Sequence, residues 1–378
     1  MLAAVTTDSS GQLDLIDLEI PKPKDGEALV RVLGSGICHS DLHVLKNEVN
    51  FPRPAVLGHE VMGQVIEVAD SNLLYPAIST GKFVVSSFIM PCRQCPRCMA
   101  GQSNICSVFF AENRLKGNML DGTKRLFAAN GAEIASYSMA GFAEYSVIPL
   151  SALVVLNSDG VKADWCVLGC AGVTAYSSVS RTLISRRASN ASSNAVAIIG
   201  LGGVGLFMTL FCKLLGVNEI IALDLDSRKL ELAEELGATK TINSLNMDAS
   251  AIKNALRISG VDIAFEAVGT SKTLELGIEI LNEGGVVTAV GIAPHGTKAG
   301  IEITPLVRRE FTLKGSFGGT VEQDLQKVVK FMEEGHIPLE KLVTQRYRLD
   351  EINDAFYSLS ERKTLGRSII EFGVEEIS

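Results

Sequence analysis

The chain has 378 residues, a hydrophobic content of 47% and a formal net charge of −8 at pH 7. Two domains are expected, because a single hydrophobic core stops growing at about 250–300 residues. The acidic balance argues against nucleic-acid partners, which require clustered Lys and Arg, and no apolar run is long enough for a membrane span. Since the first residues carry no secretory signal, a cytoplasmic protein is predicted.

The first half of the chain is predicted to be mostly β-structure. Short apolar runs broken by Pro and Gly extend over residues 13–68, and strands are expected again near 83–85 and 142–148. A loop is expected between the first two of these regions, at 71–81.

A four-cysteine lobe at 91–107 follows, with Cys92, Cys95, Cys98 and Cys106. Thiolates at two-residue gaps can turn around one tetrahedral ion, and a fourth closes the shell, which predicts a structural zinc. An iron–sulfur cluster is disfavoured, because its last cysteine usually follows a three-residue gap and precedes a proline; here the gap is seven residues and Ser107 follows. Unmetallated thiols or disulfides would also accommodate these cysteines, although eight cysteines are few for a disulfide scaffold in this length.

The segment 113–137 is polar, contains glycines and has no sustained period. It is expected to be a long loop with a hairpin around Asp121 and Gly122. Helical character begins at Asp164, and a Ser- and Asn-rich link at 189–194 precedes a sharp change of pattern.

That new pattern alternates strands and helices. Strands are expected at 195–199, 220–223, 261–265 and 286–290, with helices between them, which indicates a doubly wound parallel sheet. The pattern fades after Gly315, where helices near 322–334 and 351–362 and a strand near 367–372 are expected to rejoin the first domain. The predicted domains are therefore 1–170, 171–315 and a returning segment at 316–378.

A glycine motif lies at the start of the doubly wound region. Gly200, Gly202 and Gly205 form a GxGxxG pattern after a predicted strand, and an acidic residue, Asp224, ends the next strand nineteen residues later. Amides of Gly203 and Val204 at the helix start can bind a pyrophosphate, and the carboxylate can accept from ribose hydroxyls. NAD is favoured over NADP, because a carboxylate at this position repels a 2′-phosphate. NADP is not excluded, because the basic residues Arg228 and Lys229 follow and could bind that phosphate. The alternative is a glycine turn that binds nothing.

A candidate reaction centre lies at 36–43, where Cys38, Ser40, Asp41 and two histidines stand close together. Catalytic zinc usually takes three protein ligands and leaves a fourth position open, so further ligands must come from elsewhere. The candidates are His59 and Glu60 in one segment and Cys170 in another, just before the nucleotide domain. Cys38, His59 and Cys170, with the four-cysteine lobe and the GxGxxG unit, resemble the zinc-dependent medium-chain alcohol dehydrogenases over nearly the whole chain.

This resemblance implies a GroES-like catalytic domain, a Rossmann domain, two zinc ions per chain and specific roles for single residues. The implied catalytic zinc ligands are Cys38, His59 and Cys170, oriented by Glu60 and Asp41. The implied proton path runs from Ser40 through the cofactor ribose to His43. The implied cofactor contacts are His39 and Arg367 on the pyrophosphate, Thr174 and Val204 on the nicotinamide, and Lys229 beside Asp224 on the ribose. The implied pocket wall is Phe88.

Each of these assignments has a simpler alternative. A single buried cysteine is more often a small apolar residue than a ligand, and Cys166, one helical turn before Cys170, could compete with it. Glu60 could be a solvated carboxylate, and Phe88 could be plain core. The chemistry nevertheless agrees with the resemblance, because a Zn²⁺ Lewis acid stabilises an alkoxide near neutral pH, and a hydroxyl can both donate and accept a proton.

The predicted function is reversible hydride transfer between a zinc-bound alkoxide, from a primary or secondary alcohol, and NAD(H). Two alternatives use the same scaffold: an aldehyde or semialdehyde reductase, NADP-linked, and a metal-free quinone or enone reductase. A third is a non-enzymatic zinc module. The predicted partners are a small-molecule alcohol or aldehyde and further copies of the chain, as a homodimer or homotetramer.

Overall fold

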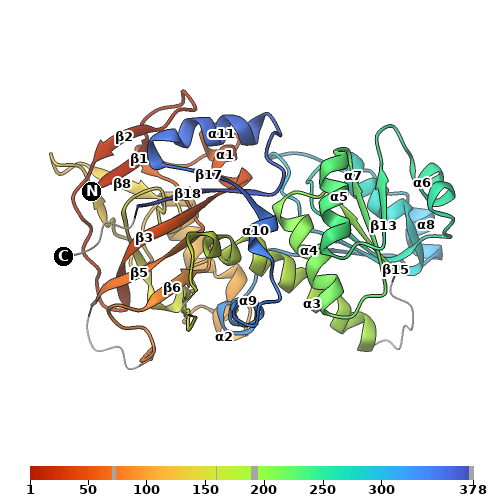
Figure 1. Ribbon diagram of the computed structural model, residues 1–378, viewed down its shortest axis with the longest axis horizontal. Coiled ribbons are helices and arrows are strands. Elements are labelled where there is room, and N and C mark those ends of the chain that lie inside the picture. Colours follow the sequence, from red (N-terminus) through yellow and green to blue (C-terminus); the bar gives the residue numbers. More distant parts are fainter. Residues whose placement is uncertain (70–73, 159, 189–194, 374–378) are drawn as a thin grey trace. The chain divides into compact units, whose positions relative to one another are not determined.

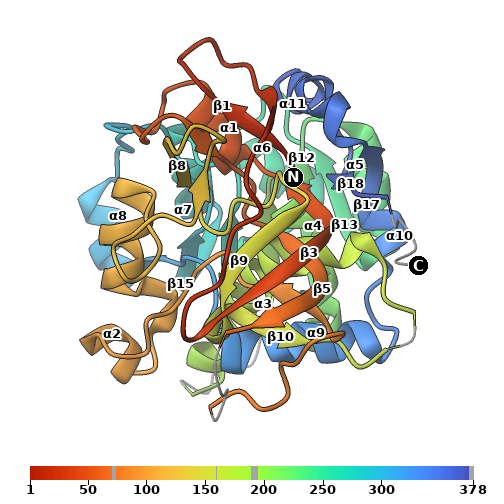
Figure 2. The same ribbon diagram turned by 90° about the vertical axis from the view of Figure 1, so that its left-hand side faces the viewer.

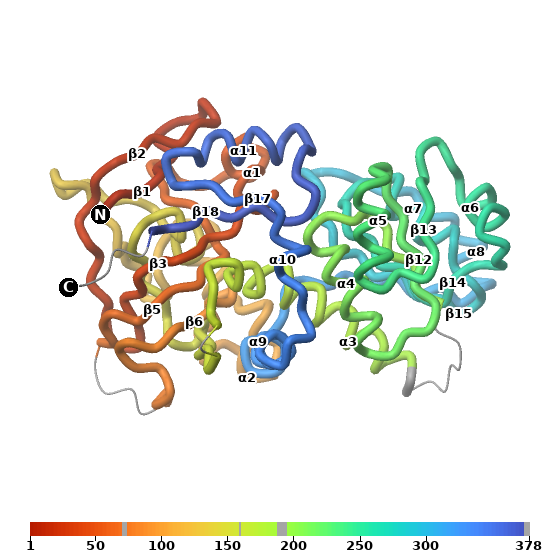
Figure 3. Tube along the Cα trace, in the orientation of Figure 1, coloured from red at the N-terminus to blue at the C-terminus, as the bar shows by residue number. Residues whose placement is uncertain are grey.

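The computed structural model describes residues 1–69, 74–158, 160–188 and 195–373. They form two compact units, one made of Met1–Val173 with Gly318–Ser378 and the other of Thr174–Phe317 (Figures 1 and 3). The predicted link at 189–194 and part of the predicted loop at 71–81 lie outside the described residues.

The first unit is built on two β-sheets, as its short apolar runs predicted. The smaller sheet has the order β2-β1-β4-β8-β7, and the larger has β10-β6-β5-β3-β18-β17 with β9 also paired to β3. Figure 2 shows β9, β3 and β5 side by side, and β3 pairs antiparallel with both neighbours. The strands are β1 (Leu2–Thr6), β2 (Asp14–Asp17), β3 (Glu27–Ile37), β4 (Ala55–Val56), β5 (Val61–Val68), β6 (Phe83–Ser86), β7 (Leu126–Phe127), β8 (Glu133–Ser136), β9 (Tyr145–Pro149), β10 (Leu153–Val155), β17 (Val343–Tyr347) and β18 (Arg367–Glu371).

Short helices connect these strands. The segment from Asp164 is the 3-10 helix η4, and the long helix begins only afterwards, at Ala171. The segments near 322–334 and 351–362 are helical, as predicted. The helical elements are α1 (His39–Leu45), α2 (Pro96–Met99), η1 (Ser103–Ile105), η2 (Phe109–Arg114), η3 (Leu150–Ala152), η4 (Ala163–Gly169), η5 (Val321–Leu325), α9 (Gln326–Glu333), α10 (Leu339–Leu342), η6 (Leu349–Glu351) and α11 (Ile352–Ser360), and α3 (Ala171–Ala188) runs from the first unit into the second.

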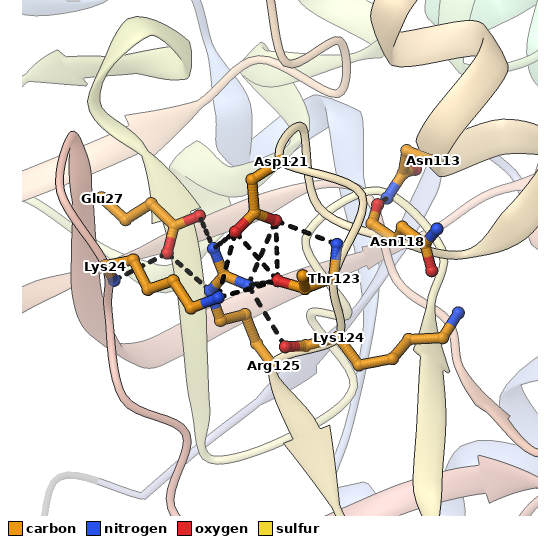
Figure 4. A network of polar contacts seen from close by, with 8 residues as sticks. All are labelled: Lys24, Glu27, Asn113, Asn118, Asp121, Thr123, Lys124 and Arg125. Atoms are coloured by element: carbon orange, nitrogen blue, oxygen red, sulfur yellow. Dashed lines mark hydrogen bonds and ion pairs between the residues drawn. The ribbon is translucent and has the colours of Figure 1, made fainter.

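The predicted hairpin at Asp121 and Gly122 is wrong. The hairpin is formed further on by β7 and β8, with Leu126 opposite Ile134, whereas Asp121 and Gly122 make a local turn in which Met119 N donates to Thr123 O at 2.8 Å. A polar network holds this turn in place (Figure 4). Arg125 donates to both carboxylate oxygens of Glu27, at 2.8 and 2.7 Å, and also contacts Asp121.

The second unit is a six-stranded, all-parallel sheet with the order β13-β12-β11-β14-β15-β16. This is the doubly wound Rossmann arrangement that the alternating pattern predicted, with the order reversing between β11 and β14. Ala197, Ile221, Leu223 and Ala264 of its strands lie in one buried core. The elements are β11 (Ala195–Ile199), α4 (Gly203–Leu214), β12 (Glu219–Asp224), α5 (Ser227–Leu236), β13 (Lys240–Asn243), α6 (Ala249–Leu256), β14 (Val261–Glu266), α7 (Ser271–Glu279), β15 (Leu281–Ala289), α8 (Ile303–Arg308) and β16 (Thr312–Gly315).

Membrane-crossing helices are absent from the part of the chain that the structure describes, since none of its helices combines the required length and apolarity.

Candidate metal and cofactor sites

The first part of the reaction centre lies where β3 passes into α1. Cys38 is the N-cap of α1 with extended backbone angles, and its carbonyl accepts from Asp41 N at 3.1 Å. This turn puts the thiol of Cys38 at the helix start, 3.9 Å from the hydroxyl of Ser40. The side chain of Asp41 is fully buried and points away from solvent into the unit.

Asp41 fixes the orientation of His59. Its Oδ1 lies 3.0 Å from Nδ1 of His59 and also accepts from the amide of Gly58 at 3.1 Å. Because an ionised carboxylate can only accept, Nδ1 of the imidazole carries the proton. Nε2 of His59 is buried and has no hydrogen-bond partner, so its lone pair is free for a ligand.

Four side chains converge at this Nε2. One ligand atom each from Cys38, His59, Glu60 and Cys170 lies within 4.8 Å of the others. Two thiols, an imidazole and a carboxylate are a donor set that zinc accepts, and the unpartnered Nε2 of His59 and Oε2 of Glu60 are what a bound cation would satisfy. The residues present therefore fit a zinc ion. Glu60, predicted only to orient the ligands, contributes a carboxylate oxygen to the same cluster of donor atoms.

The electrostatics of the cluster agree with a cation site. A hydrogen bond from Cys170 holds the pKa of Cys38 well below its usual value, and the pKa of Cys170 rises correspondingly. Burial lowers the pKa of His59, but the charges of Asp41 and Cys38 outweigh burial and raise it to about 10. The anionic groups around His59 thus favour positive charge at this position, as a cation site requires.

Arg367 belongs to the same cluster. Its guanidinium, on β18, is buried and forms an ion pair with Oε1 of Glu60. Burial raises the pKa of Glu60 to about 7 despite this partner. The contact of Arg367 with a cofactor pyrophosphate remains a prediction. Within the described part of the chain, the guanidinium is paired with Glu60.

The two predicted relay residues lie on α1. Ser40 is half-buried beside Cys38, and His43, one turn further along, contacts the carboxylate of Glu48 through Nδ1. His39, the predicted pyrophosphate contact, is exposed at the helix start.

Two residues near His59, Tyr137 and Arg114, were not found from the sequence. The ring centre of Phe88, the predicted pocket wall, lies 6.0 Å from that of His59, and the ring centre of Tyr137 lies 5.9 Å from it. The guanidinium carbon of Arg114 lies 4.0 Å from the Tyr137 ring centre. Tyr137 and Arg114 come from the segment 113–137, predicted as a long loop with a hairpin, where no periodic signal marks them.

The four-cysteine lobe forms the second cluster. The thiols of Cys92, Cys95, Cys98 and Cys106 lie within 4.8 Å of one another. Backbone amides point at three of them: Cys95 N at Cys92 Sγ, Cys98 N at Cys95 Sγ and Phe109 N at Cys106 Sγ. Such donors stabilise thiolates, so the lobe fits a structural zinc.

The glycine motif of the second unit follows β11. Gly200 has a φ of +91°, and a Cβ on Gly205 would meet the carbonyl oxygen of Gly200 at 1.9 Å, so the tight turn requires both glycines. Nothing lies within 4 Å of a Cβ built on Gly202, which leaves this face of the turn open. Gly203 and Val204 begin α4 at this turn.

Asp224 lies beside that turn, at the end of β12. Its Oδ2 accepts from Leu201 N at 2.6 Å, and its Oδ1 accepts from Leu225 N at 2.7 Å. The guanidinium of Arg228 is bound to the carboxylate of Asp226, at 2.6 and 3.1 Å. Lys229 is half-buried on α5, and Thr174 is buried on α3.

A GroES-like unit with a buried cysteine–histidine cluster and a Rossmann unit together define a zinc-binding dehydrogenase. Residues 24–158 match the family "Alcohol dehydrogenase GroES-like domain" and residues 203–334 match "Zinc-binding dehydrogenase". An S-(hydroxymethyl)glutathione dehydrogenase of Escherichia coli is 32% identical, over 98% of this chain and 99% of the relative.

Solved structures agree with this match. An alcohol dehydrogenase zinc-binding domain protein from Burkholderia ambifaria has a TM-score of 0.89 at 31% identity, covering 98% of each chain. The benzyl alcohol dehydrogenase of Acinetobacter calcoaceticus has a TM-score of 0.88 at 30% identity, covering 98% of this chain and 99% of the other. The chain belongs to the zinc-binding medium-chain alcohol dehydrogenases, a family of NAD(P)-dependent enzymes.

Proposed function

We propose that this dehydrogenase interconverts primary or secondary alcohols with aldehydes or ketones, that it prefers NAD, and that Ser40 and His43 carry the proton. The observation that carries the proposal is the unpartnered Nε2 of His59, buried among the thiols of Cys38 and Cys170. A metal-free quinone or enone reductase has no use for this set of side chains.

Cys38, His59 and Cys170 would hold the catalytic zinc, with Glu60 in reach of it. When bound, the ion supplies a Lewis acid that lowers the pKa of an alcohol hydroxyl, and the nicotinamide, when bound, accepts the hydride. Asp41 keeps the proton of His59 on Nδ1, so that Nε2 stays available. Arg367 offsets the charge of Glu60.

The hydroxyl of Ser40 is the proposed first carrier of the substrate proton. It can accept that proton while giving its own away, and it lies beside Cys38, where the alcohol oxygen would be held. His43 then holds the proton before solvent takes it, since its ring is half-buried rather than enclosed.

The preference for NAD is supported by Asp224. Three backbone amides fix its carboxylate beside the glycine turn, where a 2′-phosphate would be repelled. Arg228 is tied to Asp226 and does not neutralise that carboxylate. Steady-state rates with both cofactors test this preference; a larger kcat/KM with NADP would favour an NADP-linked aldehyde reductase instead.

Aromatic alcohols are the substrate class that the site favours. Phe88 and Tyr137 both present their rings to His59, and apolar walls of this kind select an apolar substituent next to the reacting carbon. One relative is named for benzyl alcohol and another for S-(hydroxymethyl)glutathione. A panel of benzyl alcohol, ethanol and S-(hydroxymethyl)glutathione separates these choices, and we expect the largest kcat/KM for benzyl alcohol.

Metal analysis tests the core of the proposal. About two zinc ions per chain are expected from one open and one closed ligand set. Cys38→Ser should remove the catalytic ion and nearly all turnover, while the ion of the four-cysteine lobe stays. Full turnover with unchanged metal content in that variant would overturn the proposal.

An assembly of further copies is also proposed. Ile303 and Val307 of α8 and Leu313 of β16 expose apolar side chains, and β16 is an edge strand of its sheet. Light scattering on the purified protein distinguishes a monomer, a dimer and a tetramer.

A further inference from the structure

The chain that follows α1 turns back over the relay histidine. Lys46 N donates to Leu42 O at 2.9 Å, and Asn47 then adopts a left-handed φ of 58°. Glu48 N consequently donates to the carbonyl of His43 at 2.9 Å. Asn tolerates this conformation better than most residues, so the sequence itself supports the turn that sets Glu48 beside His43.

The side chain of Glu48 uses that position to contact the imidazole of His43 at Nδ1. An ionised carboxylate only accepts hydrogen bonds, so Nδ1 must carry the proton. The lone pair of the neutral ring is then on Nε2. The side chains of His43 and Glu48 are 21% and 37% exposed, so the pair is in contact with solvent.

The other charged groups near α1 do not replace Glu48. Asp41 is turned to His59, and Arg53 donates to the carbonyl of Val44 at 2.8 Å. Lys46 is exposed at the helix end. The helix α11 packs against α1 (Figure 1), and its acidic residue Asp354 is exposed. Among the described residues, Glu48 is the charged group in contact with the ring.

We propose that Glu48 is a positioning residue for the proton relay. It holds His43 in the form that presents Nε2 as a base, and its charge stabilises the ring once the proton has arrived. This inference rests on the proposed relay through Ser40 and His43. Chemically it is the arrangement in which a carboxylate orients an imidazole by its Nδ1–H and stabilises the imidazolium.

The proton balance is simple. During alcohol oxidation Nε2 of His43 takes up one proton, while Nδ1–H stays bonded to Glu48. The ring then releases the Nε2 proton to water and returns to its starting form. In aldehyde reduction the same ring takes a proton from water and delivers it inward. The proposed reaction supplies or consumes the proton on one side and water does so on the other, so no further reactant is needed.

The test compares pH profiles of alcohol oxidation in the zinc-loaded enzyme. The variants are Glu48→Gln, which removes the charge, Glu48→Asp, which keeps it, and His43→Gln, which removes the base. Glu19→Gln, at an exposed position of the same unit, controls for the change in net charge. We expect Glu48→Gln to lower the plateau rate about three- to tenfold and to move the acid limb of the profile to lower pH, because the negative charge beside the imidazole is removed.

A purely structural role would lower the rate without moving the limb. Glu48→Asp should lie closer to the parent protein, and Glu19→Gln should match it. In a His43→Gln background the additional change Glu48→Gln should have no effect. If His43→Gln alters the profile and Glu48→Gln does not, the inference is wrong and the proposed relay stands. If His43→Gln leaves the profile unchanged, the relay fails and this inference fails with it.

A second measurement does not depend on turnover. Nitrogen NMR of histidine-labelled, zinc-loaded enzyme without cofactor reports which ring nitrogen carries the proton. The chain has five histidines, and the His43 signals are those lost in His43→Gln. We expect the Nδ1–H form in the parent protein and a shift toward the Nε2–H form in Glu48→Ala. A parent protein with the proton on Nε2 would contradict the contact.

Discussion

Arg367 and Glu60 form an ion pair inside the first unit, although 307 positions separate them in the sequence. Their side chains are 6% and 0% exposed. Gly36 on β3 makes room for the carboxylate, because a Cβ at that position would lie 1.9 Å from Oε2 of Glu60. The guanidinium therefore balances a carboxylate that lies against the thiols of the metal cluster, where an unpaired negative charge would oppose folding.

Arg367→Met should destabilise the protein strongly. Removing one partner of a buried ion pair leaves an uncompensated charge, which costs about 3–5 kcal/mol. Thermal and denaturant unfolding of the zinc-loaded protein measure this loss. Part of the stability should return in the double variant Arg367→Met/Glu60→Gln. Arg348→Met, which breaks an exposed pair with Asp350, should cost far less, because solvent screens the two charges. Equal losses in the two single variants would contradict the importance of burial.

Asp41→Ala should weaken the catalytic zinc site and spare the structural one. Without Oδ1 of Asp41, neither Nδ1 of His59 nor the amide of Gly58 keeps its partner, and the imidazole can turn or change its protonated nitrogen. Loss of such a supporting contact typically costs about 10–100-fold in metal affinity. Competition with a coloured chelator measures it, and the ion of the four-cysteine lobe serves as an internal control. Equal release of both ions would point to general unfolding instead.

The fold followed from the sequence wherever local pattern decides the structure. The apolar run at 195–199 is β11, and the glycine turn and the acidic strand end that follow are where the Rossmann pattern requires them. The hairpin at 121–122 failed because its position depends on distant partners. Arg125 reaches back to Glu27, and β8 pairs with the two-residue strand β4, and neither contact leaves a periodic trace in the sequence.

The candidate site shows the same division between residues that sequence motifs predict and contacts that only the fold creates. Cys38, His59 and Cys170 could be named because the order and spacing of their motifs resemble a known family, and the structure brings them together. The contacts that surround them could not be named. Tyr137 lies against His59 and Arg367 lies against Glu60 only because segments far apart in the sequence meet in the folded unit. Glu48 lies only five positions after His43, but its contact needs the left-handed turn at Asn47.

Asp121→Asn should change how the stability depends on pH. Burial raises the pKa of Asp121, but hydrogen bonds from Arg125 and Thr123 outweigh burial and hold it well below its ordinary value of 3.8. A carboxyl whose pKa is lowered by folding stabilises the folded state above its unfolded pKa, and that contribution is lost as the pH falls through the folded pKa. The variant should therefore be less stable from about pH 5 to 7, and the difference should shrink below about pH 4.

Urea unfolding at pH 7, 5 and 3 measures this difference. Its size should be about 1 kcal/mol or less, since the Asp121 side chain is 40% exposed and solvent screens its ion pairs. Asp25→Asn, a change at an exposed position next to Lys24 of the network, controls for net charge and for loss of metal in acid. A stability difference that stays constant down to pH 3 would contradict the assignment of the effect to the ionised carboxyl.

Arg114→Met should change the discrimination between charged and neutral substrates. The guanidinium of Arg114 is held over Tyr137 and Phe88 by ring contacts of 4.0 and 5.9 Å, and both rings face His59. Its Nη1 is buried without a hydrogen-bond partner. An unpartnered donor on a half-buried guanidinium favours an anionic group on the substrate, and methionine would keep the packing while removing the charge. We expect kcat/KM for 4-(hydroxymethyl)benzoate to fall about tenfold relative to benzyl alcohol.

Arg97→Met, at an exposed position on α2, is the control and should leave the ratio of the kcat/KM values for the two substrates unchanged. If both variants leave it unchanged, Arg114 serves only to pack the rings beside His59.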